Sequence, residues 1–363
     1  MTVIVNVLDG ENFEVAIQDD KTGKELAEEA RTTLDLEPDA KLQLYLNDGS
    51  MIIPRLQLGE QDVVGGTELN LIIQTNENKK LNDETIRVAV TDYFGKDEDK
   101  RQEITNTYGE IKDWNTYEVT DMYWLFKDCN DEEFDINISQ WDTRNVNNMA
   151  FMFMRKPNFN QPVNEWDVGN VINMNGMFYG AHNFNQPVDA WDVSNVKDMN
   201  RMFSGAHKFD QSVNTWDVGR AEDMSEMFND AIEFDQEVDT WDVSNVTNMR
   251  GMFAMAKAFN KPVDAWEVGN VKNMSSMFCY ATEFDQPVNK WDVGKVEDMS
   301  RMFYNAFKFD QNVGAWNVRH VKDMSQMFYG AKKFKKGENI KMMLPLWKTV
   351  AVDLECSNLM FGG

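Results

Sequence analysis

Cysteine and histidine are scarce in this sequence, and their spacing excludes several kinds of site. The cysteines Cys129, Cys279 and Cys356 are too scattered to form a disulfide framework. His182 and His207 lie 25 residues apart, which allows their rings to stack, but no histidine stands in a metal-ligand motif. The sequence therefore predicts reduced thiols, no bound metal and no cofactor.

Positive charge is also in short supply. The chain has 36 lysines and arginines against 61 aspartates and glutamates, which gives a formal net charge of -25. Nucleic acids and anionic membrane surfaces attract basic proteins, so we expect neither as a partner. A basic protein partner, divalent cations or solubility alone remain explanations for the acidity.

Long apolar runs are missing. The first residues, MTVIVNVLDG, have neither the basic start nor the apolar core of a signal peptide. No stretch approaches the roughly 18 apolar residues that indicate a membrane-spanning helix. We therefore expect an intracellular protein in the cytoplasm.

Catalytic motifs are absent from the pattern as well. There is no phosphate-binding glycine loop and no Ser/His/Asp or Cys/His arrangement. A general acid–base pair needs two carboxylates in different environments, whereas the acidic residues here recur in regular positions. We expect no catalytic residues and no enzymatic activity.

A repeat of 25 residues fills most of the chain. The phrase WDVSNVTNMRGMF at 241–253 returns as WDVSNVKDMNRMF at 191–203 and as WDVGKVEDMSRMF at 291–303. Methionine and phenylalanine rows keep the same step, and Trp114 begins a ninth, slightly longer copy. A fixed period without insertions is typical of a solenoid, in which equivalent residues stack in rows. The tryptophans that mark the period are Trp141, Trp166, Trp191, Trp216, Trp241, Trp266, Trp291 and Trp316.

One copy, residues 163–184, predicts the structure of a single coil. Val163–Val168 has the spacing of a leucine-rich-repeat strand, with Trp166 and Val168 on one side. The apolar residues of Met174–Ala181 fall on one face of a two-turn helix, and Asn173 is its expected N-cap. Each coil is thus expected to run strand, bend, short helix and return, and the Trp, Met and Phe rows to form the core.

The order W-x-V-x-x-V-x-x-M-x-x-M-F-x-x-A-x-x-F resembles the BspA-like leucine-rich repeats. More closely, it resembles the 25-residue repeat of unknown function found in mycoplasmal and other microbial surface proteins. The resemblance covers residues 110–334 and implies an α/β solenoid of leucine-rich-repeat type, with about nine strand–helix coils. It also implies a role in adhesion or binding rather than catalysis.

A row of carboxylates follows the tryptophans and is named here the acidic row. Like charges one strand spacing apart repel each other, so either the fold offsets the repulsion or a partner uses it. The carboxylates could bond backbone N–H groups in their own bends, or pair with Arg144, Arg220, Lys295 or Arg319. Alternatively, they could bind a basic protein surface. The acidic row consists of Asp142, Asp167, Asp192, Asp217, Asp242, Glu267 and Asp292.

A row of glutamines recurs from Gln161 to Gln311 and is interrupted by Lys261. Stacked amides can bond each other along a solenoid, so we expect this row to be structural.

The segments that flank the repeat have the features of caps, which a solenoid needs to cover its terminal apolar faces. Residues 83–109 follow a polar linker at 76–82, and their first part has Ile86, Val90 and Tyr93 at helical spacing. They are expected to form a helical N-terminal cap. Residues 335–363 are expected to form a C-terminal cap.

Residues 1–75 form a separate domain with a different pattern. Alternating stretches at VIVNVL and FEVAI flank the turn Asp9–Gly10, a helix-like stretch follows, and LQLYL and ELNLII complete the series. The order ββαββ suggests a small β-grasp fold of the α+β class. The stretches EPDAKLQLYLNDG at 37–49 and LGEQDVVGGTELNLII at 58–73 resemble ubiquitin. The resemblance implies an exposed apolar binding patch at Leu8, Tyr45 and Ile72.

These features together favour a non-enzymatic adaptor or scaffold that binds proteins. The acidic face of the solenoid would bind a basic partner, and the ubiquitin-like domain would bind a second one. A structural spacer or a subunit of a larger assembly is the first alternative, and an exposed aromatic row would favour it. The second alternative is cation-dependent adhesion at a cell surface, although a flat row of carboxylates offers few ligands per calcium ion. The pattern leaves the oligomeric state open.

Overall fold

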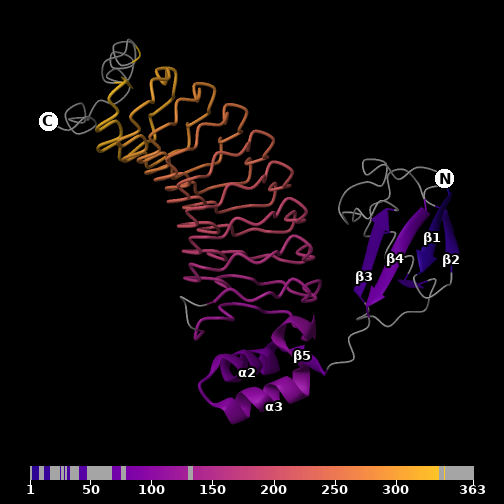
Figure 1. The fold of residues 1–363 in the computed structure, drawn as a ribbon. Coiled ribbons are helices and arrows are strands. Elements are labelled where there is room, and N and C mark those ends of the chain that lie inside the picture. Colours follow the sequence, from indigo (N-terminus) through magenta and orange to yellow (C-terminus); the bar gives the residue numbers. More distant parts are fainter. Residues whose placement is uncertain are drawn as a thin grey trace.

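The computed structural model describes residues 2–7, 12–16, 25, 28, 31–32, 41–46, 68–74, 79–129, 134–334 and 339. Figure 1 shows a curved stack of coils, with helices packed at its N-terminal end and a separate four-stranded sheet. The expected C-terminal cap lies outside the described residues, except for Asn339. No helix in the described part is long and apolar enough to cross a membrane.

The N-terminal sheet contains the four expected strands. These are β1 (Thr2–Val7), β2 (Asn12–Ala16), β3 (Lys41–Leu46) and β4 (Glu68–Gln74). Their order is β2-β1-β4-β3, with a parallel central pair and antiparallel outer pairs. Of the expected helix, the described residues Glu25, Glu28, Arg31 and Thr32 are helical.

The N-terminal end of the stack carries two helices, as the pattern predicts. Helix α2 (Asp83–Phe94) begins at a capping box between Asn82 and Thr85, and α3 (Glu98–Tyr108) follows after a short turn. Residues 80–82, which the sequence suggests are linker, instead form β5 (Lys80–Asn82). This strand pairs in parallel with β6 (Asn115–Glu118), after the short 3-10 helix η2 (Ile111–Asp113).

Helix α2 also completes the first coil. The N–H of Asn147 donates to the carbonyl of Thr120 in the coil before it, at 2.9 Å. Equivalent bonds link later coils, as from Ile172 N–H to the Asn147 carbonyl. Thr120 has no earlier coil to bond, and its N–H donates to Asp83 Oδ1 of α2 at 2.6 Å. Because an unpaired backbone N–H is costly, this carboxylate lets the stack start without an open edge.

The expected strand and the expected short helix do not form in the described coils, so both predictions are wrong. The described parts of the coils are joined by single parallel bridges between their Asn or Asp residues, from Asp121 through Asn173 to Asp323. Asn173 Oδ1 does accept a backbone N–H, as a helix N-cap would, but the donor is Asn175 in a tight turn. The apolar spacing matches a helix, but the backbone follows another path.

Along that path, alternate backbone N–H groups point toward the next coil. The N–H groups of Met174, Gly176, Phe178 and Gly180 donate to carbonyls of the next coil at 2.7–2.9 Å. Turn bonds within the coil, such as Met177 N–H to the Met174 carbonyl at 3.1 Å, use some of the others. We name the eight residues that begin at each bridging Asn or Asp the ladder strip; in this coil it is 173–180.

From the strip of Asn148 onward, two positions of each ladder strip have a left-handed backbone with φ between 54° and 72°, whereas the strip of Asp121 has one, Trp124. Glycine adopts this conformation freely, whereas other residues meet a cost of roughly 1–2 kcal/mol each. The bonds between coils offset that cost, since many of these residues are not glycine. The first left-handed row is Phe151, Gly176, Arg201, Glu226, Gly251, Ser276, Arg301 and Gln326. The second left-handed row is Arg155, Gly180, Gly205, Asp230, Met255, Tyr280, Asn305 and Gly330.

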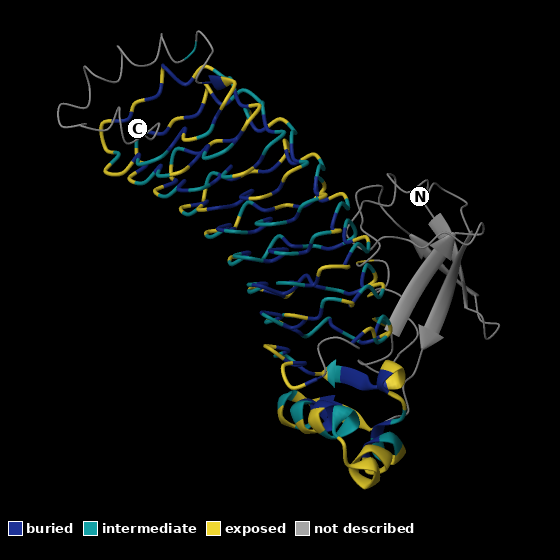
Figure 2. Cartoon of the chain, turned by 60° about the vertical axis from the view of Figure 1, so that its left-hand side comes forward, coloured by how far each residue is buried: buried dark blue, intermediate teal, exposed yellow. Residues whose placement is uncertain are grey.

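The Trp, Met and Phe rows form the core, as predicted. Figure 2 shows that buried positions recur from coil to coil along the stack. Trp191 and Trp216 stack with ring centroids 6.4 Å apart. Phe203 stacks on Phe228 of the next coil at 5.7 Å and on Phe209 of its own coil at 3.9 Å. Equivalent rings therefore lie in continuous columns along the stack.

The tryptophans also anchor each coil to the one before it. Trp191 Nε1 donates to the Val163 carbonyl at 2.8 Å, and Trp166 Nε1 donates to the Ile138 carbonyl at 3.2 Å. These bonds let a large ring with a polar N–H be fully buried, which explains why Trp rather than Phe recurs here.

Replacing Trp191 with Phe should therefore lower the free energy of unfolding by about 1–3 kcal/mol, because the smaller ring loses the Nε1 bond to the preceding coil and leaves space in a packed column. The Val163 carbonyl keeps its bond from the Trp166 N–H at 3.1 Å. Urea unfolding followed by circular dichroism measures the change. Trp124→Phe is the matched control: Trp124 is 40% exposed and its φ of 51° resembles that of Phe151, so its loss should be within about 0.5 kcal/mol. Equal losses in both variants would contradict the anchoring role.

Candidate functional site

The acidic row lies in the bends after the buried tryptophans, and most of its members bond their own bend. Asp167 Oδ1 accepts the Gly169 N–H at 3.0 Å, and Asp242 Oδ1 accepts the Ser244 N–H at 2.9 Å. The same bond forms at Asp142, Asp192, Asp217 and Asp292. One oxygen of each of these carboxylates thus fixes the local turn, in the manner of an Asx-turn.

The two halves of the acidic row differ in exposure and pairing. Asp142 is partly buried and forms an ion pair with Arg144 at 2.9 Å. No ion pair reaches the exposed members within the described residues; the nearby Lys295 donates to the Asn270 amide oxygen at 2.6 Å instead. We name these members the exposed half of the acidic row: Asp217, Asp242, Glu267 and Asp292.

Acidic residues elsewhere on the stack are commonly paired between coils. Lys197 reaches Glu222 at 3.4 Å, and Lys322 reaches Glu297 at 2.5 Å. Glu226 binds both Arg201 and Arg250; burial raises its pKa, but the hydrogen bond and charge of Arg201, helped by Arg250, outweigh this and leave the pKa below its usual value. The exposed half of the acidic row has no such ion pair among the described residues.

The glutamine row is structural, but its bonding differs from the expected amide ladder. Gln186 Nε2 donates to Asn160 Oδ1 of the preceding coil at 3.1 Å, and Gln311 Nε2 donates to Asp285 Oδ1 at 2.8 Å. The glutamines from Gln186 to Gln311 thus bond an Asn or Asp rather than another glutamine. At the interruption, Lys261 forms an ion pair with Asp235 at 3.3 Å, which preserves the link between coils.

The expected patch on the N-terminal domain is only partly described. Leu8 lies outside the described residues. Tyr45 pairs with Asn70, and Ile72 pairs with Gln43, so the two occupy diagonal positions on the neighbouring strands β3 and β4.

The ladder strip presents a second surface, which the sequence pattern misassigned to a helix. Its left-handed rows hold residues of every kind, from Arg201 and Glu226 to Gly251. Toward its C-terminal end, Tyr280, Tyr304 and Tyr329 form a column with ring centroids 5.4 and 5.0 Å apart. Tyr280 and Tyr329 are each 40% exposed. Only the backbone path shows that these variable residues share one face.

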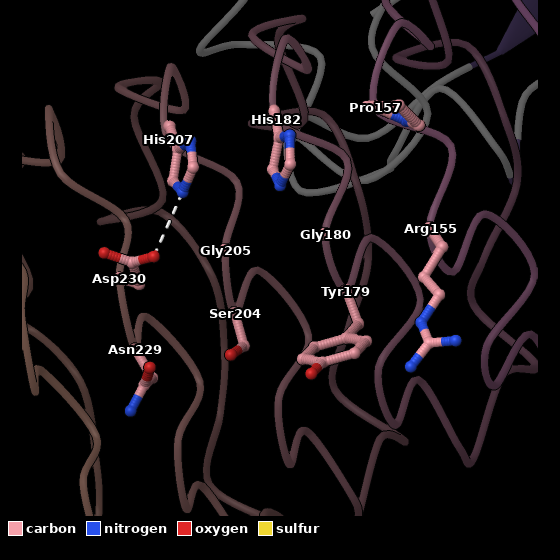
Figure 3. Close-up of a pocket in the computed structure, with 10 residues that line it drawn as sticks. All are labelled: Arg155, Pro157, Tyr179, Gly180, His182, Ser204, Gly205, His207, Asn229 and Asp230. Atoms are coloured by element: carbon pink, nitrogen blue, oxygen red, sulfur yellow. Dashed lines mark hydrogen bonds and ion pairs between the residues drawn. The ribbon is translucent and has the colours of Figure 1, made fainter. Parts of the chain in front are cut away.

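A groove of about 420 Å³ lies beside the ladder strip, and Figure 3 shows the residues that line it. The rings of His182 and His207 are stacked at 4.3 Å, as their spacing predicts. His207 Nε2 lies 3.0 Å from Asp230 Oδ2. Burial and the neighbouring His207 lower the pKa of His182 below its usual value, which favours the neutral ring at pH 7. No cluster of three or more potential metal ligands occurs among the residues searched, which are the described ones.

Substitutions of Asp242 test whether the acidic row stabilises the bends of its own coils. Asp242→Ala removes the acceptor for the Ser244 N–H and should lower the free energy of unfolding by about 1 kcal/mol, whereas Asp242→Asn keeps an acceptor and should cost less. Chemical denaturation of both variants measures this difference. Equal losses would show that the bond contributes nothing.

The same comparison has a pH dependence with a definite sign. The hydrogen bonds from the Ser244 side chain and backbone lower the pKa of Asp242. The extra stability of the wild-type carboxylate over Asn is therefore present above the ordinary Asp pKa and is lost as the pH falls through the lowered value.

Comparison with known proteins agrees with the repeated architecture. No curated protein matches the chain. Among solved structures, a computationally designed protein based on human erythrocytic ubiquitin, determined by NMR, is similar to a part of the chain. It is 29% identical, covers 22% of this chain and 96% of its own length, and has a TM-score of 0.20. A family model matches in tandem at residues 98–216, 186–278 and 222–342, which together exceed half of the chain. The chain therefore belongs to the repeat family described as "Mycoplasma protein of unknown function, DUF285".

Proposed function

We propose that this protein is a non-enzymatic interaction scaffold, whose coils bind a basic segment of a partner protein along the exposed half of the acidic row. The observation that carries the proposal is the contrast in pairing. Acidic side chains such as Glu222, Glu233 and Glu297 are neutralised by lysines of neighbouring coils, whereas Asp217, Asp242, Glu267 and Asp292 have no ion pair within the described residues.

The geometry suits an extended basic segment. Adjacent carboxylates along the row are separated by one coil, or about 4.8 Å if the spacing equals that of paired strands. One oxygen of Asp242 is held by the bend, and its lowered pKa keeps the carboxylate ionised at neutral pH. A row of fixed charges on a rigid support needs little reorganisation when a partner's lysines or arginines arrive.

The proposal includes the finer architecture that the sequence suggests. We take the stack to consist of about nine coils, and residues 1–75 to be a ubiquitin-like β-grasp domain that makes a second contact through Leu8, Tyr45 and Ile72. The strand order β2-β1-β4-β3 with a parallel central pair supports this fold. Two contacts on one chain would strengthen binding through effective concentration. We place the scaffold inside the cell.

A fourfold amide variant tests the acidic row: Asp217→Asn, Asp242→Asn, Glu267→Gln and Asp292→Asn together. The amides keep the acceptors of the bends but remove the charges. Fluorescence anisotropy with a lysine- and arginine-rich peptide, at low and moderate salt, should show at least about five-fold weaker binding, since exposed ion pairs contribute roughly 0.2–1 kcal/mol each.

The matched control removes the same charge from paired positions: Glu222→Gln, Glu233→Gln, Glu283→Gln and Glu297→Gln together, whose partners are lysines of neighbouring coils. This variant should keep most of the affinity. If both variants lose the same affinity, net charge alone attracts the peptide and the proposed site is wrong.

The column of tyrosines favours a second candidate function, a subunit of a larger assembly. Tyr280 and Tyr329 are exposed at the C-terminal end of the ladder strip, and Phe307 nearby is 37% exposed. Aromatic side chains are enriched at protein interfaces, because they bury much area at a small entropy cost.

Size-exclusion chromatography with light scattering tests this candidate. The wild-type chain should show a mass that rises with concentration, and Tyr304→Ser with Tyr329→Ser should shift it to the monomer. Serine is accepted at this position, since Ser204 occupies it in another coil. Tyr123→Ser, at an exposed tyrosine near the other end, is the control. A wild-type chain that stays monomeric at all concentrations would contradict self-assembly.

A further inference from the structure

The groove beside the ladder strip has a floor without side chains. In the second left-handed row, Gly180 and Gly205 lie between Arg155 at one end and Asp230 at the other. Figure 3 shows this order along neighbouring coils. If coils are spaced as paired strands are, Arg155 and Asp230 are three steps or about 14 Å apart. The volume of about 420 Å³ falls within the range of about 300–1,000 Å³ that is typical of small-molecule sites.

The backbone does not require glycine at position 180. Arg155, Asp230 and Met255 hold the same left-handed conformation in their own coils, with φ between 56° and 61°. A Cβ at Gly180 would meet its nearest neighbour at 3.7 Å, which is ordinary contact, whereas one at Gly205 would meet Gly180 at a tighter 3.4 Å. The glycine at 180 therefore leaves space over the floor rather than relieving strain.

Three polar side chains around this floor have no hydrogen-bond partner within the described part of the chain. Most polar side chains on the stack bond a neighbouring coil, as Arg201 does with Glu226 at 2.6 Å. In contrast, the side chains of Arg155, Ser204 and Asn229 make no hydrogen bond or ion pair with the described residues. Ser204 is only 5% exposed. Unused donors and acceptors at the edge of a cavity are what a polar ligand needs.

The backbone N–H groups at the floor are already used. The Gly180 N–H donates to the Ser204 carbonyl, and the Gly205 N–H donates to the Asn229 carbonyl, both at 2.7 Å. A peptide strand that adds to a sheet edge needs both N–H and C=O groups, and neither floor glycine offers it an N–H. Recognition must therefore come from side chains and ring faces. A guanidinium without an ion pair fits a carboxylate, with which it can form two parallel hydrogen bonds.

We propose that the groove binds a short acidic sugar whose carboxylate is held by Arg155. The hydroxyl groups of the sugar bond Ser204 and Asn229, and one ring face lies against Tyr179. A neutral His182 can both donate to and accept from a hydroxyl. This site is separate from the acidic row, and its ligand is of opposite charge to the basic partner proposed above.

Isothermal titration calorimetry on the full chain tests the proposal with a disaccharide that ends in glucuronic acid, and with the analogue that ends in glucose. The acidic sugar should bind at least about ten-fold more tightly, because a charge-assisted pair is among the stronger hydrogen-bonded contacts. Arg155→Gln should remove that preference. Arg220→Gln, at an exposed arginine in a bend of the acidic row, is the charge-matched control and should bind like the wild type.

A second variant places a side chain over the glycine floor of the groove. Asn is accepted at left-handed positions, and Asn305 occupies the position equivalent to Gly180 in another coil. The Oδ1 atom of Asn305 lies 1.8 Å from the place that a Cβ on Gly330 would occupy, so this side chain extends over the next residue of the row. Gly180→Asn should likewise extend over Gly205 and abolish binding. An unchanged melting temperature would confirm that the variant is folded.

Three results would overturn the proposal. The first is no binding of the acidic sugar, and the second is equal affinity for both sugars. The third is tighter binding of the tripeptide Gly-Gly-Glu than of the sugar, which would make a peptide carboxylate the occupant of the groove instead.

Discussion

The stack depends on backbone hydrogen bonds that join each coil to the next one, in place of bonds that a helix would form within the coil. Left-handed residues in the ladder strips, such as Gly176 and Gly180, turn alternate N–H groups toward the next coil. Each coil thereby satisfies the carbonyls of its neighbour, and no coil can satisfy them alone. Stability must then be nearly a sum of coil terms and interface terms, which is the behaviour of repeat proteins. The carboxylate of Asp83 closes the first edge and shows how strongly this rule acts.

The same repetition sets which positions are free to vary. Trp191, Met199 and Phe203 are fixed by the columns of side chains above and below them, where a change in one coil leaves a cavity between two others. Positions in the two left-handed rows of the ladder strip lie outside these columns and share the need for a positive φ. That constraint is met by arginine, glutamate, tyrosine and glycine alike. The rigid interior thus supports surfaces that differ from coil to coil, including the groove at Gly180 and the tyrosine column near Tyr304.

The acidic residues of the stack also fall into two groups, which differ in how the repulsion between them is reduced. Equivalent residues lie about one strand spacing apart, so any acidic position that repeats will repel itself along the stack. Lys208 with Glu233 and Lys322 with Glu297 relieve this by pairing across coils. The acidic row relieves it less completely, through hydrogen bonds to its own bends. A surface that is both ordered and unneutralised is suited to a partner of opposite charge.

The sequence by itself determined the period, the core, and the location of the N-terminal sheet and of the helices at the N-terminal end of the stack. A step of 25 residues between tryptophans requires stacked coils, and the four strands of the N-terminal sheet follow from alternation and turn residues. The stacking of His182 on His207 also followed from spacing alone. Local pattern was enough in these cases, because each depends on which residues are equivalent rather than on the path of the backbone.

Only the tertiary structure decided the path within a coil and the face that each residue occupies. The spacing of Met174, Met177 and Phe178 fits an α-helix, yet a helix would keep its N–H groups for itself, while the stack needs them for the next coil. The glutamines likewise bond Asn160 and its equivalents, which no pattern of glutamines could indicate. The groove between Arg155 and Asp230 exists because residues from successive coils converge there, and that convergence is a property of the stack and not of any one repeat.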